Sequence, residues 1–376
     1  MNSKQKNQPS MKWSMRLGTL AGIAVYVHAT FLILLLWIAL SYWRSEQSLQ
    51  AVAQGVGFIL ALFACVVLHE LGHALTARRF GIKTRDITLL PIGGVASLEK
   101  MPDDPKQEIL VALAGPAVNI VIAGLIWLWL NLQQAVMPGE LSSMLQGSML
   151  QQLLVVNLFL AGFNLLPAFP MDGGRVLRAL LAMRMDRTAA TRRAASVGQA
   201  FALWLGLVGM LYNPFLLFIA LFVWIGAMAE AGTEEIRSLL HDATLSHAII
   251  THFESLSPYD SLARVIKLTL DGVQKDFPVI ENGEVIGVLT QEDLLRGLQE
   301  KGALANVGEY MQTNVEEADI NESLESVMKR LQSSGGRLLA VTENNRLAGI
   351  VNIDNIMELV RIEAALREGN RAFRGL

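Results

Sequence analysis

The sequence predicts a polytopic α-helical membrane protein, with about six transmembrane helices followed by a soluble α/β domain. Of its 376 residues, 52% are hydrophobic and 17% are charged, whereas an ordinary soluble domain carries about 25% charged residues. The apolar residues before residue 232 gather in runs as long as a bilayer requires, about 20 residues per helix. After residue 232 the charges are interspersed, and short β-branched runs alternate with amphipathic ones, as in a soluble α/β domain.

The expected transmembrane spans lie near residues 22–43, 52–76, 108–132, 150–170, 197–212 and 214–231. Basic residues in short loops mark the cytoplasmic side. Residues 1–16, 78–106 and 172–193 together hold sixteen Lys and Arg, whereas the three opposing loops hold only Arg44. We therefore expect an integral membrane protein with both termini in the cytoplasm. As a separate expectation, its membrane is a bacterial-type inner membrane. The net charge of −3, without a basic face, gives no reason to expect nucleic acid as a partner.

The second expected span contains two histidines and a glutamate within the run VVLHELGHAL, residues 66–75. On a helix, His69 and His73 stand on one face, at a separation that a single tetrahedral zinc ion can bridge. Glu70 lies beside them, where H-E-x-x-H sites place the general base. The alternative is a pair of histidines that bond to neighbouring spans. Because ionisable groups in membrane spans are costly and usually mark a functional interior, we favour the metal site.

A catalytic zinc ion normally takes three protein ligands, so a third ligand is needed. The fourth span ends in FNLLPAFPMDGGR, where Pro167 and Pro170 break the helix. Broken backbone at membrane depth is tolerated only where protein or water lines it. This end shares the cytoplasmic depth of the histidines, so Asp172 can reach the same metal. The alternatives for Asp172 are an N-cap of the next helix or an ion pair with Arg175.

H-E-x-x-H on a membrane helix, followed two spans later by N-x₂-P-x₂-P-x-D-G, resembles the site-2 protease family of intramembrane zinc metalloproteases, over residues of about 15–230. The resemblance implies peptide hydrolysis in transmembrane segments of membrane-tethered regulators, such as an anti-sigma factor, within the lipid bilayer. It also implies roles for five residues: one zinc ion held by His69, His73 and Asp172, Glu70 as the catalytic base, and Asn164 as a contact to the substrate or the oxyanion.

Two further features have a functional and a structural interpretation. Residues 89–100, LLPIGGVASLEK, alternate like a short strand pair. In the resembling family such a segment can pair with an unwound substrate by strand addition, and the alternative is an ordinary cytoplasmic hairpin. His28 enters the first span near its cytoplasmic end. We interpret it as a hydrogen-bonded interfacial histidine rather than a catalytic one.

The C-terminal part contains an internal repeat. The segment that starts at Asp260 overlays the segment that starts at Glu322 without a gap, at a constant offset of 62 residues. Residues 241–362 thereby resemble a tandem pair of cystathionine β-synthase (CBS) domains, modules that bind adenine nucleotides in that family. The expected division of the chain is an N-terminal segment 1–21, a metalloprotease domain 22–231, a linker 232–244, CBS repeats 245–302 and 303–362, and a tail 363–376.

The resemblance implies that the first repeat carries a nucleotide motif, with Thr290 near phosphate and Asp293 on ribose. The second repeat has Asn352 and Asn355 at these positions, so we expect at most one adenosine site. The alternative is a structural CBS pair, or one that forms a homodimer. A CBS-gated transporter or channel is the alternative function for the whole chain, but the membrane part shows no repeat in its sequence.

Overall fold

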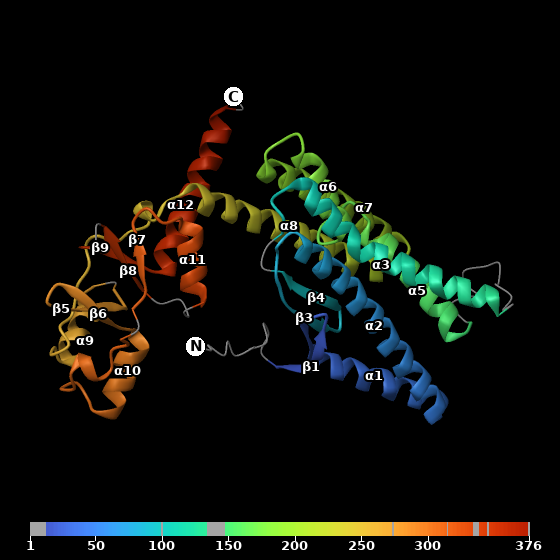
Figure 1. The fold of residues 1–376 in the computed structure, drawn as a ribbon, viewed down its shortest axis with the longest axis horizontal. Coiled ribbons are helices and arrows are strands. Elements are labelled where there is room, and N and C mark those ends of the chain that lie inside the picture. Colours follow the sequence, from blue (N-terminus) through green and yellow to red (C-terminus); the bar gives the residue numbers. More distant parts are fainter. Residues whose placement is uncertain are drawn as a thin grey trace. The chain divides into compact units, whose positions relative to one another are not determined.

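A computed structural model describes residues 13–98, 101–133, 147–272, 274–313, 315–333, 338–343 and 346–374. The chain divides into two compact units, Met1–Gly232 and Thr233–Leu376, and each is described by itself. The first unit consists mainly of apolar helices with one small sheet, and the second consists of helices that alternate with short strands (Figure 1).

The helices of the first unit are α1 (Ala29–Glu46), α2 (Leu49–Arg79), α3 (Pro105–Leu132), α5 (Met149–Asn164), α6 (Asp172–Ala182), α7 (Arg187–Leu211) and α8 (Phe215–Asp242). Within the described residues, four helices are long and apolar enough to cross a membrane: α2, α3, α7 and, as far as Leu240, α8. α5 is a shorter apolar helix of 16 residues. The predicted fold class is confirmed, because several apolar helices suited to membrane spans precede an α/β unit.

Several helix ends differ from the expected spans: α7 begins at Arg187 and not near residue 197, and α8 ends at Asp242 and not near residue 231. Two further differences have local reasons. The first apolar helix begins at Ala29 and not near residue 22, because residues 23–28 form a strand. The fourth ends at Asn164. Pro167 and Pro170 follow, and neither can donate the backbone hydrogen bond that would continue the helix.

α2 and α3 pack against each other along a face of small residues. Gly72 on α2 faces Ala114 on α3, where an added Cβ would stand 2.8 Å from the carbonyl oxygen. Small residues allow such close approach of helices in membranes. The α3 backbone therefore lies next to the face of α2 that carries His69 and His73.

Four strands form one mixed sheet beside α2 (Figure 1). They lie in the order β1 (Ser14–Leu20), β2 (Ile23–His28), β3 (Thr84–Leu90) and β4 (Gly93–Leu98). β2 and β3 are parallel, and the two outer pairs are antiparallel. The expected strand pair in residues 89–100 is confirmed by β3 and β4, whereas β1 and β2 were not predicted. β4 is an edge strand, and an added Cβ on Gly94 would stand 2.9 Å from Glu70 Cγ.

The second unit contains two repeats of the same build. Its elements are α9 (Leu262–Asp271), β5 (Phe277–Glu281), β6 (Glu284–Leu289), α10 (Gln291–Glu300), β7 (Glu317–Asp319), α11 (Leu324–Ser333), β8 (Leu339–Glu343), β9 (Arg346–Val351) and α12 (Ile353–Arg374). The two repeats make equivalent bridges, in which corresponding residues are 62 positions apart. Val288 bridges to Gln312, and Ile350 bridges to Ile250, so each repeat pairs with the segment that leads into the other.

Candidate metal centre and catalytic pocket

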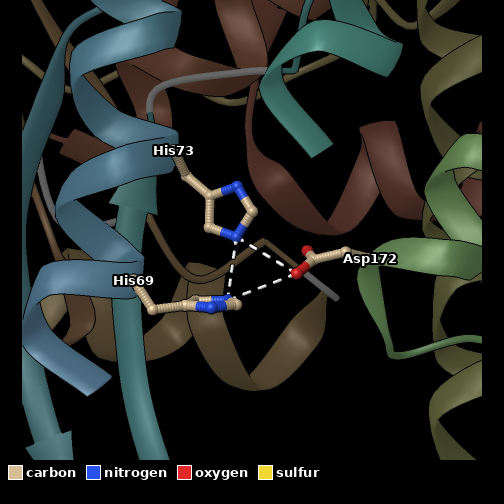
Figure 2. Close-up of side chains that lie close together, drawn as sticks. All are labelled: His69, His73 and Asp172. Carbon is tan, nitrogen blue, oxygen red and sulfur yellow. Dashed lines mark hydrogen bonds and ion pairs between the residues drawn. The ribbon is translucent and has the colours of Figure 1, made fainter. Parts of the chain in front are cut away.

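Two side chains from α2 and one from α6 converge on a single point. His69 Nε2 and His73 Nε2 are 3.1 Å apart. Asp172 Oδ2 lies 3.3 Å from the first nitrogen and 3.1 Å from the second (Figure 2). All three residues are buried, and they form the one group within the described residues whose ligand atoms could hold a metal ion. The structure therefore brings together the three ligands that the sequence predicts.

The separations fit a zinc ion. Nitrogen and oxygen ligands lie about 2.0 to 2.1 Å from zinc, so two ligands of a tetrahedral site are about 3.3 Å apart. The three observed distances span 3.1 to 3.3 Å. Three ligands also leave the fourth position of a tetrahedron for water or substrate, as in catalytic zinc sites.

The hydrogen bonds of the two rings point their lone pairs toward this position. His73 Nδ1 donates to the backbone carbonyl of Val111 over 2.7 Å, and His69 Nδ1 donates to Asn119 Oδ1 over 2.5 Å. A neutral ring that donates from Nδ1 carries its lone pair on Nε2. Both rings are thereby set in the form that a cation requires, and both partners lie on α3.

Space for an ion exists because α3 has a glycine at this place. An added Cβ on Gly115 would stand 2.2 Å from His73 Nε2 and 2.6 Å from His69 Nε2. These distances are close to a zinc–nitrogen bond length of about 2.0 Å. A side chain here would occupy the space in front of both nitrogens, so the donor set and the cavity together fit the metal.

A chain of buried amides, which the sequence analysis missed, extends the site into α5. Asn119 Nδ2 donates to Asn157 Oδ1 over 2.8 Å, and Asn157 Nδ2 donates to the carbonyl of Leu153 over 2.9 Å. Both asparagines are fully buried. The available signal was Asn157 itself, a lone amide within the apolar run LLVVNLFL, because polar residues in membrane spans usually have partners.

A pocket of about 420 Å³ opens at the metal-ligating set. Its lining includes Glu70, Asn164 and Arg175, together with β4 residues from Gly93 to Ala96. The predicted base and the predicted oxyanion contact therefore face the same space. From the sequence, Arg175 is expected only as an ion-pair partner of Asp172. Its Nε is shut off from solvent and makes no hydrogen bond within the described residues.

His28 caps α1, since its Nδ1 accepts a hydrogen bond from the backbone N–H of Thr30 over 3.3 Å. This agrees with a hydrogen-bonded histidine at the start of the first helix. It gives the ring a structural use.

Thr290 and Asp293 form a capping box at the start of α10. Asp293 is buried, and its Oδ2 accepts hydrogen bonds from Thr290 Oγ1 (2.6 Å) and Gln312 Nε2 (2.7 Å). Its Oδ1 accepts from Arg296 over 2.8 Å. A ribose would have to replace one of these partners, so the nucleotide site stays a prediction.

The chain is similar to known proteins in both of its parts. Residues 57–148 and 134–209 match the family described as "Peptidase family M50", and residues 236–300 and 307–362 match "CBS domain". A zinc metalloprotease of Methanocaldococcus jannaschii is 33% identical over 360 residues, which cover 94% of this chain and 97% of that protein. A putative zinc metalloprotease of Synechocystis is 29% identical over 377 residues, with 94% and 97% covered.

Among solved structures, a site-2 protease from Methanocaldococcus jannaschii is 38% identical, with a TM-score of 0.43, and the match covers 58% of this chain and 95% of that chain. The relative that matches nearly the full length of this chain is a zinc metalloprotease. This match favours a protease over the alternative function, a CBS-gated transporter or channel. The chain therefore belongs to peptidase family M50, the site-2 proteases, and is a zinc metalloprotease with a pair of CBS domains.

Proposed function

We propose that the chain is an intramembrane endopeptidase, which hydrolyses peptide bonds in transmembrane segments of membrane-tethered regulatory proteins. One observation carries the proposal: two histidine rings, a carboxylate and Glu70 meet in one pocket among apolar helices. Ionisable groups at such a place are expensive unless they have a function.

In this proposal His69, His73 and Asp172 hold the zinc ion. When bound, zinc acts as a Lewis acid that polarises a carbonyl and lowers the pKa of water. Glu70 takes the proton of the attacking water and passes it to the leaving amine. Asn164 and Arg175 offer N–H donors in the same pocket, where they would stabilise negative charge on the carbonyl oxygen.

The edge strand β4 supports a substrate that is unwound before cleavage. A transmembrane helix hides each carbonyl in its own hydrogen bonds, and unwinding it in lipid leaves backbone groups without partners. β4 lies at the end of its sheet and lines the pocket. A substrate strand that pairs with β4 would recover these hydrogen bonds. Because Gly94 approaches Glu70 closely, such a strand would present a carbonyl beside the base.

The remaining parts of the proposal concern setting and control. The distribution of Lys and Arg supports cytoplasmic termini. The host membrane in this proposal is a bacterial-type inner membrane. The substrate class would include anti-sigma factors and similar tethered regulators. The CBS pair, with repeats at residues 245–302 and 303–362, would modulate cleavage by binding an adenine nucleotide. It would also be the part through which two chains form a homodimer.

The experiment compares cleavage of a model transmembrane segment in vesicles by the wild-type chain and by the Glu70→Gln variant. The segment should carry helix-weakening residues, and a matched segment of strong helix formers serves as the control substrate. We expect cleavage of the first segment by the wild-type chain alone. Equal cleavage by the Glu70→Gln variant would disprove the catalytic role of Glu70. Equal cleavage of both segments would disprove the need for unwinding.

A further inference from the structure

A buried ion-pair cluster lies outside the metal-ligating set. Arg178 on α6 and Glu108 on α3 are only 2% and 0% exposed. Arg178 Nε donates to Glu108 Oε1 over 2.7 Å, and its Nη2 contacts the same oxygen. Its Nη1 donates to Glu230 Oε1 on α8 over 2.6 Å. One guanidinium group therefore joins three helices.

The planar shape of arginine matters in this cluster. A guanidinium group presents donors in fixed directions and can bind two carboxylates at once, whereas a lysine ammonium is a point charge on a flexible stem. The Arg178 Cζ atom also lies 5.3 Å from the ring centroid of Phe169, in the broken segment that precedes Asp172. The contacts thus fix α6 in direction as well as in distance.

Both helices that the Arg178–Glu108 pair joins carry parts of the metal centre. α3 orients the two histidine rings through the Val111 carbonyl and the Asn119 side chain. Val111 lies three residues after Glu108. α6 begins with Asp172, six residues before Arg178. The spacing between α3 and α6 therefore sets the distance between the rings and the carboxylate.

We propose that Arg178 is a positioning residue, which holds α6 against α3 so that Asp172 meets the histidine rings at ligand distance. The inference rests on the metal centre of the proposed function. Glu230 brings α8 into the same contact, and α8 continues without a break to Asp242, past the boundary of the two units at Gly232. A shift of α8 would therefore also move α6 and the Asp172 carboxylate.

The test measures the zinc affinity of the purified full chain in detergent, by competition with a chelator, and the unfolding temperature of the zinc-free chain. Arg178→Lys keeps the charge and loses the planar fork. The double variant R178M/E108Q removes both charges, so that neither is left buried without a partner. It also removes the carboxylate that lies 3.2 Å from Arg187 Nη1 on α7, which keeps its hydrogen bond to the Pro102 carbonyl. Arg184→Lys is the matched control, because Arg184 follows α6 with an exposed side chain.

We expect R178K and R178M/E108Q to bind zinc about 10- to 100-fold more weakly than the wild-type chain, as for other partners that orient metal ligands. The control should bind as the wild type does. Glu230→Gln should weaken binding in the same direction. Because Glu230 acts through Arg178, R178K/E230Q should bind no more weakly than R178K.

Wild-type zinc affinity in both Arg178 variants, with a lowered unfolding temperature, would leave Arg178 with a structural role only and overturn the inference. If neither variant folds, E230Q decides, because the Glu230 side chain is 29% exposed and tolerates the change; unchanged affinity there would contradict the inference. His73→Ala tests the metal centre separately. Wild-type affinity in that variant would show that the proposed centre itself is wrong.

Discussion

Gly115 on α3 lies directly in front of His73, so close that an added Cβ would stand 2.2 Å from its Nε2. A methyl group at this place would compete with a zinc ion for the same space. We expect Gly115→Ala to abolish zinc binding, or to weaken it by more than about 100-fold, the upper end for changes outside the ligand set. Metal analysis of the purified chain measures this directly.

The matched control is Gly124→Ala on the same helix, where an added Cβ would meet no atom of the described residues within 4 Å. Both changes raise helix propensity by a similar amount. A zinc-loaded G115A chain, or a G124A chain without zinc, would contradict the assignment of this space to the metal.

Glu70 lines the pocket without being one of the three converging ligands. Glu70→Gln should therefore keep zinc and lose catalysis, by about 10²- to 10⁴-fold in kcat for a removed general base. His69→Ala should lose both. Zinc content and cleavage rate are measured on the same preparations. If E70Q lost its zinc, the glutamate would be a ligand and its role as a base would have to be given up.

Asn119 connects the metal centre to α5, because it accepts from His69 and donates to Asn157. Asn119→Ala leaves the Nδ1–H of His69 buried without a partner, which costs about 1 to 3 kcal/mol. We expect zinc affinity to fall about 10- to 100-fold. Asn131→Ala is the control, since Asn131 lies on the same helix with an exposed side chain bonded to the carbonyl of Trp127. Equal affinities in the two variants would rule out the orienting role.

The site was predictable from the sequence to the extent that its chemistry is local. His69, Glu70 and His73 follow from the H-E-x-x-H motif and from helix periodicity, because all three lie within one helical turn. Asp172 required an argument about depth, because it lies on another helix. The Asn119–Asn157 contact joins residues 38 positions apart, and no spacing in the sequence encodes it.

The count of Lys and Arg in the loops predicts the cytoplasmic side of the membrane. It does not show that some of the same residues also form buried ion pairs. Arg178 and Arg187 belong to the basic group in residues 172–193, yet both contact the buried Glu108. A sequence pattern records that a charge is present and does not record its partner. Their packing role required the structure.

The expected first span includes the residues of β2, because an apolar run can be a helix or a buried strand. β1 lies in the N-terminal segment 1–21, for which the sequence predicted no element. The neglected signal was the turn between them. Ala21 and Gly22 both have positive φ, at 49° and 86°, and glycine is the residue that adopts such values readily. Residues Ile23, Val25 and Val27 then alternate as β-branched residues do in a strand.

Thr290 is the N-cap of α10, and its Oγ1 accepts from the Asp293 backbone N–H over 3.2 Å. Thr290→Ala should reduce the stability of the CBS pair by about 1 kcal/mol, the usual cost of a lost N-cap. Thr290→Ser keeps the cap and is the control. Denaturant unfolding of the full chain, followed by circular dichroism, measures the difference. A stable T290A chain that loses affinity for adenine nucleotide would instead favour a binding role for the hydroxyl.

The raised pKa of the Asp276 carboxyl group makes the stability of the CBS pair depend on pH. Burial raises the pKa of Asp276 above its ordinary value of 3.8, and the charges of Asp293 and Asp354 raise it further. The carboxyl group therefore binds its proton more tightly in the folded chain than in the unfolded one. Its contribution to stability is fully present below pH 3.8 and is lost as the pH rises through the folded value. At neutral pH the ionised group opposes folding.

Asp276→Asn should thus raise the unfolding temperature of the CBS pair at pH 7 and give no such gain near pH 4. The amide oxygen still accepts the hydrogen bond that Asp276 Oδ1 takes from the Gln291 backbone N–H over 3.1 Å. Thermal unfolding of the full chain at both pH values measures the effect, and the transition that T290A shifts identifies the CBS pair. Asp271→Asn, an exposed change in the same repeat, should leave the temperature unchanged. A D276N chain with a lower unfolding temperature at pH 7 would contradict this prediction. It would show that the ionised carboxylate stabilises the fold, because its hydrogen bond contributes more than the burial of its charge costs.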